Sequence, residues 1–303
     1  MAPLFNYRKK GDIMNRFKSI KKASVLGIIG NLFLLIIKSI IGIITNSQGM
    51  TADAFNSAGD IFSSFMTFIG NKIASKPRDD DHNLGHGKAE YIYSMLISVA
   101  MFLMSLKIFS NSLSALINKK SFLFSKWLII VCIITILTKL ILFIYTNYLY
   151  KKHNNLLIKA NSKDHFNDVL LTSANLLSCI LALKGIYFLD SIVGIGISLW
   201  IIITAFKIFK ESYDVLMDKS ISNATREKVY QIINTHDEIK KVIHFNSTPV
   251  GYRYQISFTI YVDGNMTTYE SHKIADNLEK EINNKIDEIY LTVIHVNPIN
   301  IKK

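Results

Sequence analysis

The sequence predicts an α-helical membrane protein, with a bundle of six transmembrane helices followed by a small C-terminal α+β domain. Half of the 303 residues are hydrophobic and fall in clusters, basic residues gather in alternate connecting segments, and the chain becomes polar after residue 210. A helix needs roughly 20 apolar residues to cross a hydrocarbon core. Six stretches are long enough: 23–45, 51–74, 90–114, 126–150, 165–184 and 187–209.

The basic residues predict how the bundle is oriented. Residues 1–22 are rich in Lys and Arg and lack the apolar core of a signal peptide, so we expect a cytoplasmic tail. Segments 75–89 and 151–164 are also basic, whereas 46–50 and 185–186 contain no Lys or Arg; the third outside loop departs from this pattern, with Lys119, Lys120 and Lys126. The positive-inside rule therefore places both termini in the cytoplasm. We expect an integral membrane protein, in the plasma membrane. Much of the net charge of +12 lies beside the spans, so anionic lipid explains it better than nucleic acid.

The polar C-terminal part predicts a separate domain. Tyr254 to Val262 alternates with period two, as in a half-buried strand, and Asp263-Gly264 supplies a turn after it. The predicted elements are a helix at 224–235, strands at 240–247 and 252–262, a helix at 267–285 and a strand at 289–296. This αββαβ order predicts a sheet with helices on one face.

Two pairs of polar residues interrupt the second and fifth apolar stretches. Asn56 and Asp60 are four residues apart, as are Asp164 and Asp168, so each pair lies on one face of a helix. A carboxylate inside a bilayer costs about 2.5–3.5 kcal/mol on insertion scales. If the two helices pack together, the four side chains form a candidate cation site. Hydrogen bonding between helices is the alternative interpretation.

All four of these side chains offer oxygen. Hard divalent ions such as Mn²⁺ and Mg²⁺ accept oxygen ligands, whereas Zn²⁺ is usually held with help from imidazole or thiolate. The site therefore favours Mn²⁺, with Fe²⁺ also compatible. Asp53 and Asn161 lie three residues before the two pairs and would surround the ligands or form an access step. His165 points about 100° away from Asp164, so we do not expect it to be a ligand.

Together with the segment DDDHNLGHGKAE at 79–90, these residues resemble the cation diffusion facilitator family. The resemblance implies six spans, a ferredoxin-like or metallochaperone-like cytoplasmic domain, and a homodimeric antiporter that exports divalent metal in exchange for protons. Zinc-transporting relatives have His or Asp at the position of Asn56, and His at the position of Asp164. This chain resembles the manganese-transporting branch instead.

The resemblance also implies features outside the membrane. Asp79 and His86 match a second metal site in the loop between spans two and three, with His82 nearby; a solvated loop is the alternative. Lys88 matches a lysine that pairs with an acid beyond the sixth span, here Asp218, at the dimer centre.

In the C-terminal domain, three histidines match metal ligands of relatives: His244, His272 and His295. Ser257 and Asn297 replace a His and an Asp of that site, so a dimerisation domain without metal is the default interpretation.

The sequence thus predicts a transporter rather than an enzyme, since it contains no nucleotide-binding loop and no nucleophile–base arrangement. We expect a tail at 1–22, a transport domain at 23–209 and a cytoplasmic domain at 210–303. The predicted mechanism is alternating access with protons as counter-ion and no cofactor beyond the transported metal. A zinc exporter, a passive divalent-cation channel and a membrane metal sensor remain the alternatives.

Overall fold

The computed structural model describes residues 7–44, 48–117, 126–182 and 188–299. The chain divides into two compact units. The first comprises residues 1–75 and 89–213, and the second comprises residues 76–88 and 214–303. The loop at 76–88 is therefore grouped with the C-terminal domain and not with the helices that it connects.

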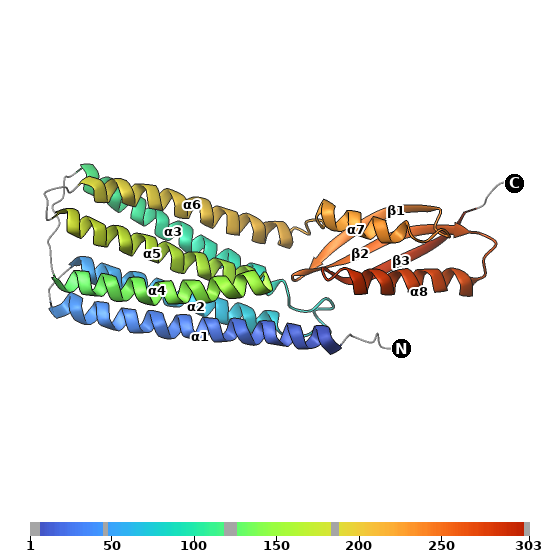
Figure 1. Cartoon of the computed structure of the whole chain (residues 1–303), viewed down its shortest axis with the longest axis horizontal. Helices are drawn as coiled ribbons and strands as arrows, with labels where there is room; N and C mark the ends of the chain where they lie inside the picture. Colours follow the sequence, from blue (N-terminus) through green and yellow to red (C-terminus); the bar gives the residue numbers. More distant parts are fainter. Residues whose placement is uncertain (1–6, 45–47, 118–125, 183–187, 300–303) are drawn as a thin grey trace. The chain divides into compact units, whose positions relative to one another are not determined.

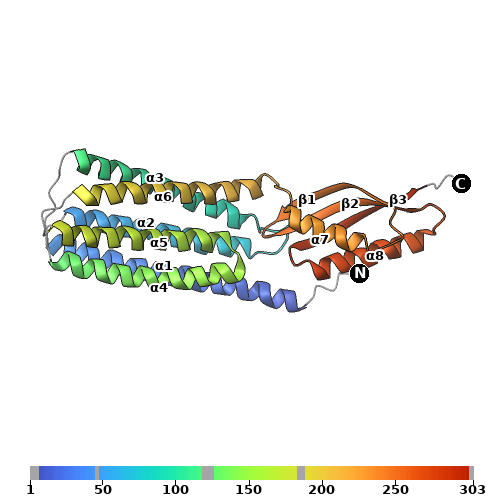
Figure 2. The same ribbon diagram turned by 45° about the horizontal axis from the view of Figure 1, so that its top comes forward.

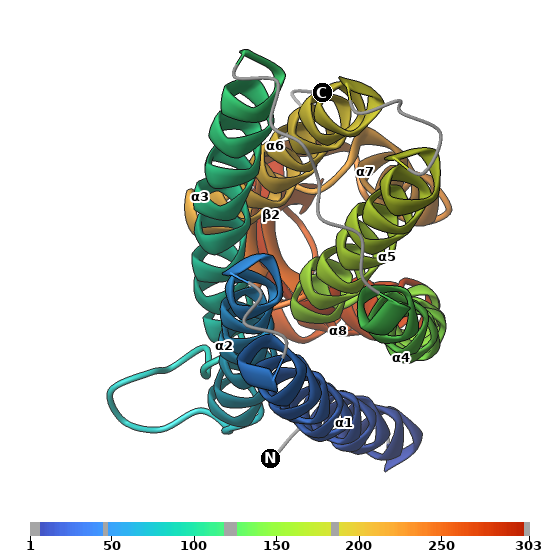
Figure 3. The same cartoon turned by 90° about the vertical axis from the view of Figure 1, so that its left-hand side faces the viewer.

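The first unit is a bundle of six long helices (Figures 1 and 2). Their bounds are α1 Tyr7–Ile44, α2 Gln48–Ala74, α3 Ala89–Ile117, α4 Lys126–His153, α5 Leu156–Ala182 and α6 Phe188–Leu216. Viewed along the bundle, α2 lies between α1 and α3, and α4 lies beside α5 (Figure 3), in agreement with the extensive α1–α2 and α4–α5 packing.

Three segments of the described helices are long and apolar enough to cross a membrane: Asn15–Ile41, Ala89–Ser114 and Ile129–His153. They belong to α1, α3 and α4, and large apolar side chains such as Leu103 and Ile141 are exposed on them. Outward apolar side chains are what a lipid environment requires, so this unit is a helical transmembrane domain. The other predicted spans, on α2, α5 and α6, stay a prediction.

Helix α2 is less apolar than its neighbours because the face that it buries is polar. Its buried side chains are largely polar and recur every three or four residues: Ser57, Asp60, Ser63, Ser64, Thr67 and Asn71. Residues with this spacing share one helix face. Phe62 and Phe65, between them, are exposed. The helix therefore presents a polar face to the bundle interior and apolar side chains outward.

Helix α1 begins at Tyr7, so the basic segment expected as a tail is helical from that residue onward. Arg16 is buried there because its Nη2 donates a hydrogen bond to Glu90 Oε2 at 2.7 Å. Ile20 and Ala23, farther along the same face, are also buried and continue the contact with the bundle. The partner of Arg16 is 74 residues away in the chain, so local sequence gives no sign of it.

The second unit has the predicted αββαβ order. Its elements are α7 Asn223–Ile233, β1 Lys241–Val250, β2 Arg253–Asp263, α8 Thr268–Lys285 and β3 Ile289–Ile299. The sheet order is β1-β2-β3, with β1 antiparallel and β3 parallel to the central strand. Ile256, Phe258 and Ile260 of β2 pack against Val229 of α7 and Leu278 of α8 in one core.

Candidate metal site between helices α2, α4 and α5

A buried lysine links one acid of α2 with one acid of α5. Lys139 Nζ, on α4, donates hydrogen bonds to Asp60 Oδ2 at 2.6 Å and to Asp168 Oδ2 at 2.5 Å. The lysine side chain is 1% exposed, and those of Asp60 and Asp168 are 11% and 21% exposed. The structure thus brings Asp60 and Asp168 together, as the two predicted pairs require, around one positively charged atom.

Asp164 is a third carboxylate near these two, although the three side chains do not bring one oxygen each within 4.8 Å of one another. Asp164 accepts a hydrogen bond from Ser63 and lies close enough to Asp60, Asp168 and Lys139 to interact with their charges. Its Oδ2 is buried and has no hydrogen-bond partner among the described residues. A buried carboxylate oxygen without a donor is costly unless a cation or water satisfies it, so this oxygen is suited to bind a cation.

The polar face of α2 continues beyond the carboxylates toward the helix end that precedes the loop at 76–88. Asn161 Nδ2, on α5, lies 3.5 Å from Ser64 Oγ and 3.4 Å from Thr67 Oγ1, and Asn31 Nδ2 of α1 donates to Ser64 Oγ at 3.3 Å. Asn161 therefore lies on the same polar face as Asp164, one turn nearer the start of α5. The carbonyl oxygens of both asparagines are buried without partners in the described part of the bundle.

A cavity of about 160 Å³ adjoins the carboxylates. The residues that line it come from α1 to α5: Lys38, Asp60, Ile108, Asn111, Ser112, Thr135, Lys139, Asp168, Leu171 and Thr172. Several of these precede Lys139 on α4 or follow Asp168 on α5, so the cavity extends away from the polar face described above. It has room for several water molecules.

The predicted ligand Asn56, its neighbour Asp53 and the rejected ligand His165 lie as follows. Asn56 and Asp53 lie on α2, but their side chains are outside the described part of the structure. His165 is fully buried, and neither ring nitrogen has a hydrogen-bond partner among the described residues. Its Nε2 is 3.8 Å from where a Cβ on Gly27 would lie, so the ring faces α1.

The sequence indicates packing, snorkelling or a salt bridge for Lys139, rather than contact with the transported ion, and the structure shows the salt bridge. A charged residue at the centre of an apolar stretch must find a counter-charge within the bundle, and Lys139 lies near the middle of the predicted span at 126–150. That rule, applied together with the two acid pairs, could have identified the acids as the partners of Lys139.

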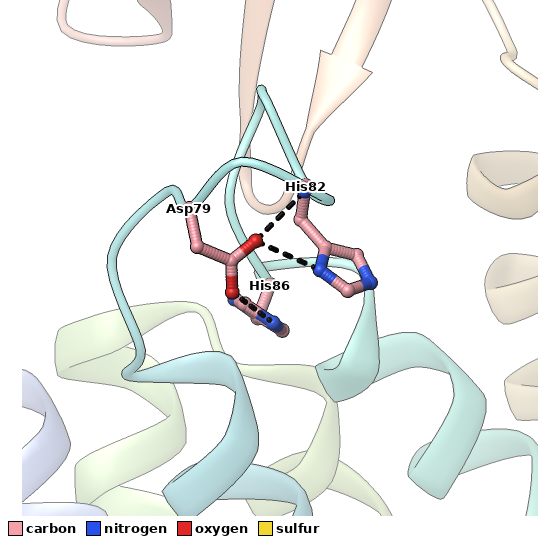
Figure 4. Close-up of side chains that lie close together, drawn as sticks. All are labelled: Asp79, His82 and His86. Atoms are coloured by element: carbon pink, nitrogen blue, oxygen red, sulfur yellow. Dashed lines mark hydrogen bonds and ion pairs between the residues drawn. The ribbon is translucent and has the colours of Figure 1, made fainter.

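A second cluster lies in the loop at 76–88 (Figure 4). His82 Nδ1 is 3.0 Å from Asp79 Oδ1, and His86 Nε2 is 3.4 Å from Asp79 Oδ2. One potential ligand atom from each residue lies within 4.8 Å of the others. Two imidazoles and a carboxylate form a ligand set that suits zinc or another divalent ion. The structure thus joins His82 to the predicted pair of Asp79 and His86.

Hydrogen bonds and nearby charge favour the ionised form of Asp79, which is the form that binds a cation. Partial desolvation acts to raise its pKa, but hydrogen bonds from the side chain and backbone of His82, and the nearby charge of both imidazoles, outweigh it. The pKa of Asp79 is therefore lower than its ordinary value, and the side chain is ionised at neutral pH.

The structure also brings Lys88 and Asp218 together, with Lys88 Nζ 2.7 Å from Asp218 Oδ1. Asp218 follows the end of α6 with a φ of 55°, a left-handed conformation that often ends helices. Both side chains are partly exposed to solvent.

The three predicted histidines of the C-terminal domain lie on separate elements. His244 is in β1 beside a bulge, His295 is in β3 opposite Thr259 of β2, and His272 is exposed on α8 with Nε2 3.6 Å from Asp276 Oδ1. Among the described residues, the loop cluster is the group of three His or acidic residues close enough to share a metal, and these histidines form no such group.

Comparisons with known proteins were made for both units. A family model described as the cation efflux transmembrane domain matches residues 24–217, and one described as the cytoplasmic domain of cation efflux proteins matches residues 221–299. Protein p34 of Rickettsia prowazekii is 30% identical over 285 residues, which cover 94% of each chain.

Two relatives from Bacillus subtilis have names that state a metal. The manganese efflux system protein MneP is 26% identical over 92% of this chain and 96% of its own. The manganese efflux system protein MneS is 26% identical over 95% of this chain and 100% of its own. A solved structure, the metal-bound C-terminal domain of the CzcD transporter from Thermotoga maritima, aligns with 27% of this chain and 100% of its own, at 21% identity and a TM-score of 0.26.

Proposed function

The chain belongs to the cation efflux family, and from this premise we propose that it exports Mn²⁺ from the cytosol in exchange for protons. It is a divalent-metal transporter of the membrane and not an enzyme. Fe²⁺ is the alternative substrate within the proposal, and no resident cofactor is involved.

One observation carries the proposal: Asp60 and Asp168, from two different helices, converge on a single cationic atom. The geometry that binds an ammonium can bind a metal ion, because both need carboxylate oxygens directed at one point. Asp164 adds an oxygen that has no donor among the described residues. We propose that Asn56, one turn before Asp60, supplies the fourth oxygen.

The preference for manganese follows from the chemistry of the ligands. Three carboxylates and an amide oxygen form a hard set that suits Mn²⁺ better than Zn²⁺. The Nε2 of His165, the nearest imidazole in sequence, lies 3.8 Å from where a Cβ on Gly27 of α1 would lie. The names of the two Bacillus relatives point to the same metal.

The polar surroundings support alternating access. The polar face of α2 and α5, with Asn161 and Asn31, leads from the carboxylates toward the loop at 76–88, and the cavity extends in the other direction. We propose that the first route admits cytosolic metal and that the second releases it. Carboxylates must lose their protons to bind metal, so metal binding and proton binding exclude one another. This exclusion couples the two fluxes.

We further propose that α1–α6 supply six spans with both termini in the cytoplasm, in the plasma membrane. In this arrangement residues 1–22 are a basic cytoplasmic segment, residues 23–209 the transport domain and residues 210–303 the cytoplasmic domain. The cytoplasmic domain holds two copies together, with the Lys88–Asp218 pair at the dimer centre. Asp79, His82 and His86 form an additional metal site, whereas His244, His272 and His295 have a role in metal binding only if the second copy completes it.

Metal flux into proteoliposomes under an imposed pH gradient tests the proposal. We expect proton-coupled Mn²⁺ flux that exceeds Zn²⁺ flux and that falls at least tenfold in Asp60→Asn, which keeps the side-chain size and removes the charge. Faster Zn²⁺ flux would indicate a zinc exporter. Ion currents that ignore the pH gradient would indicate a channel. Unchanged flux in Asp60→Asn would rule out the membrane site.

A further inference from the structure

We propose that Lys139 is a built-in competitor of the transported ion: its ammonium binds between Asp60 and Asp168 when metal does not, and withdraws into the adjoining cavity when metal binds. This inference rests on the proposed function and adds a residue that sets the metal affinity of its site.

The geometry makes the two cations mutually exclusive. Lys139 Nζ lies 2.6 Å from Asp60 Oδ2 and 2.5 Å from Asp168 Oδ2, so it uses one oxygen of each carboxylate. A metal ion coordinated by both carboxylates would occupy nearly the same point, because hard divalent ions bind oxygen at distances of about 2.0–2.6 Å. Metal can therefore bind both acids only after the ammonium has moved.

The structure provides a place for the displaced ammonium. The cavity of about 160 Å³ is lined by Lys139 itself and by Thr135, which precedes it by one helical turn on the same face of α4. Thr135 Oγ1 is buried and has no hydrogen-bond partner in the described part of the structure. Asn111 and Ser112 of α3 line the same cavity. A lysine has a flexible four-carbon stem and three donors, so it can exchange the carboxylates for these neutral oxygens.

The charges around the site give the exchange a direction. Asp60 and Asp168 accept hydrogen bonds from Lys139, Asp164 lies close enough to interact with its charge, and Lys38 lines the adjoining cavity. When the three aspartates and the two lysines are all ionised, their net charge is −1. Binding of a divalent ion changes this net charge to +1. Lys139 is then repelled by the metal, and the neutral oxygens of the cavity, such as Thr135 Oγ1, can accept its hydrogen bonds. The return of Lys139 competes with the metal for the carboxylate oxygens and so promotes release, which an exporter requires.

Substitutions of opposite sense test this role. Lys139→Met removes the charge at similar length, and we expect it to lower the KM for Mn²⁺ at least tenfold and to lower kcat, because release becomes slow. Lys139→Arg keeps the charge and binds two carboxylates through a rigid fork of donors, so we expect it to raise KM at least tenfold. A lysine that only stabilises the fold predicts no such opposite shifts.

The full-length protein is assayed in proteoliposomes, and Mn²⁺ binding is measured by calorimetry in a His82→Ala, His86→Ala background so that the loop cluster does not contribute. Weaker or unchanged Mn²⁺ binding in Lys139→Met, with binding abolished in Asp60→Asn, overturns the inference and leaves the proposed function intact. Mn²⁺ binding that survives in Asp60→Asn overturns both the inference about Lys139 and the proposed membrane site.

Thr135→Val provides an independent variant should Lys139→Met not fold. It removes the acceptor for the displaced ammonium and leaves the carboxylates untouched. We expect a severalfold rise in the KM for Mn²⁺ with little change in thermal stability. An unchanged or lower KM overturns the inference.

Discussion

Glu90 accepts a hydrogen bond from the backbone N–H of Leu156 at 2.8 Å while its other carboxylate oxygen holds Arg16 at 2.7 Å. Leu156 is the first residue of α5, where helix N–H groups lack intrahelical acceptors and a negative charge is favoured. One side chain at the start of α3 therefore connects the ends of α1 and α5. Glu90 closes the GHGKAE segment, so this part of the motif has a role in assembling the bundle.

We predict that Glu90→Gln destabilises the bundle strongly. The change leaves Arg16 buried beside a neutral amide, and removal of one partner of a buried ion pair typically costs about 3–5 kcal/mol. Thermal unfolding in detergent measures the effect. Glu211→Gln is the matched control, because Glu211 pairs with Lys159 where both are more exposed, and such pairs contribute about 1 kcal/mol or less. Equal losses in the two variants would contradict the prediction.

The start of α8 provides a test of local stability. Thr267 caps the helix and forms a reciprocal capping box with Glu270. Thr267→Ala should cost about 1 kcal/mol, which corresponds to roughly a fivefold loss of hydrogen-exchange protection in the first turn of α8. Ser222→Ala at the cap of α7 is the control, since it should affect α7 amides and leave those of α8 unchanged.

The same cap predicts a pH dependence. Hydrogen bonds from the backbone and side chain of Thr267 lower the pKa of Glu270, and desolvation only partly opposes them. A lowered pKa in the folded state means that the stabilisation is present at neutral pH and is lost as the pH falls through that pKa. The difference in α8 protection between the natural chain and Glu270→Gln should therefore shrink below about pH 4. A difference that stays constant into acid would exclude this role of the carboxylate.

The loop cluster predicts a second, separable metal affinity. His82→Ala and His86→Ala should each weaken Zn²⁺ binding at least tenfold, because each removes one of three ligands whose atoms lie within 4.8 Å. Asp81 is an exposed acid of the same loop and lies outside the cluster, so Asp81→Asn is the control and should bind Zn²⁺ normally. Binding should also weaken on acidification, because imidazole must be neutral to bind metal, while the lowered pKa of Asp79 keeps that ligand ionised. Chelator competition at several pH values measures both effects.

Two glycines in the second unit predict a steric effect. A Cβ on Gly87 would lie 2.8 Å from Gly251 Cα, which follows β1 in a turn with a φ of 64°. Gly87→Ala should therefore shift the loop, disturb the adjacent Lys88–Asp218 pair and destabilise the protein by more than about 1 kcal/mol. Gly196→Ala on α6 meets nothing within 4 Å and should be neutral or stabilising by up to about 1 kcal/mol. Thermal unfolding of the two variants distinguishes steric contact from a general effect of replacing glycine.

The C-terminal domain could be predicted closely because its signals are local. The alternation from Tyr254 to Val262 predicted the strand that the structure places at Arg253–Asp263, and the predicted helix at 267–285 is Thr268–Lys285. The beginning of α1 could not be predicted in this way. Its basic residues resemble a solvated tail, and the burial of Arg16 depends on Glu90, far along the chain.

The carboxylates of the candidate site were predicted from their spacing, since four-residue pairs on two apolar stretches have few other uses. Their convergence is a matter of helix packing, which spacing alone does not give. For Lys139 the sequence indicates packing, snorkelling or a salt bridge, but it does not identify Asp60 and Asp168 as the partners. The choice among these explanations depends on how α2, α4 and α5 pack together, and this packing is visible only in the structure.

The loop at 76–88 has a consequence for truncation experiments. A chain cut after residue 213 would keep this loop but lose Asp218 and Gly251, which contact Lys88 and Gly87. The connection between α2 and α3 would then be left without its packing partners. Loss of transport in such a shortened protein would therefore not measure dimerisation alone. Substitutions at the dimer interface of the C-terminal domain that leave these two contacts intact would separate the effect of dimerisation from that of transport.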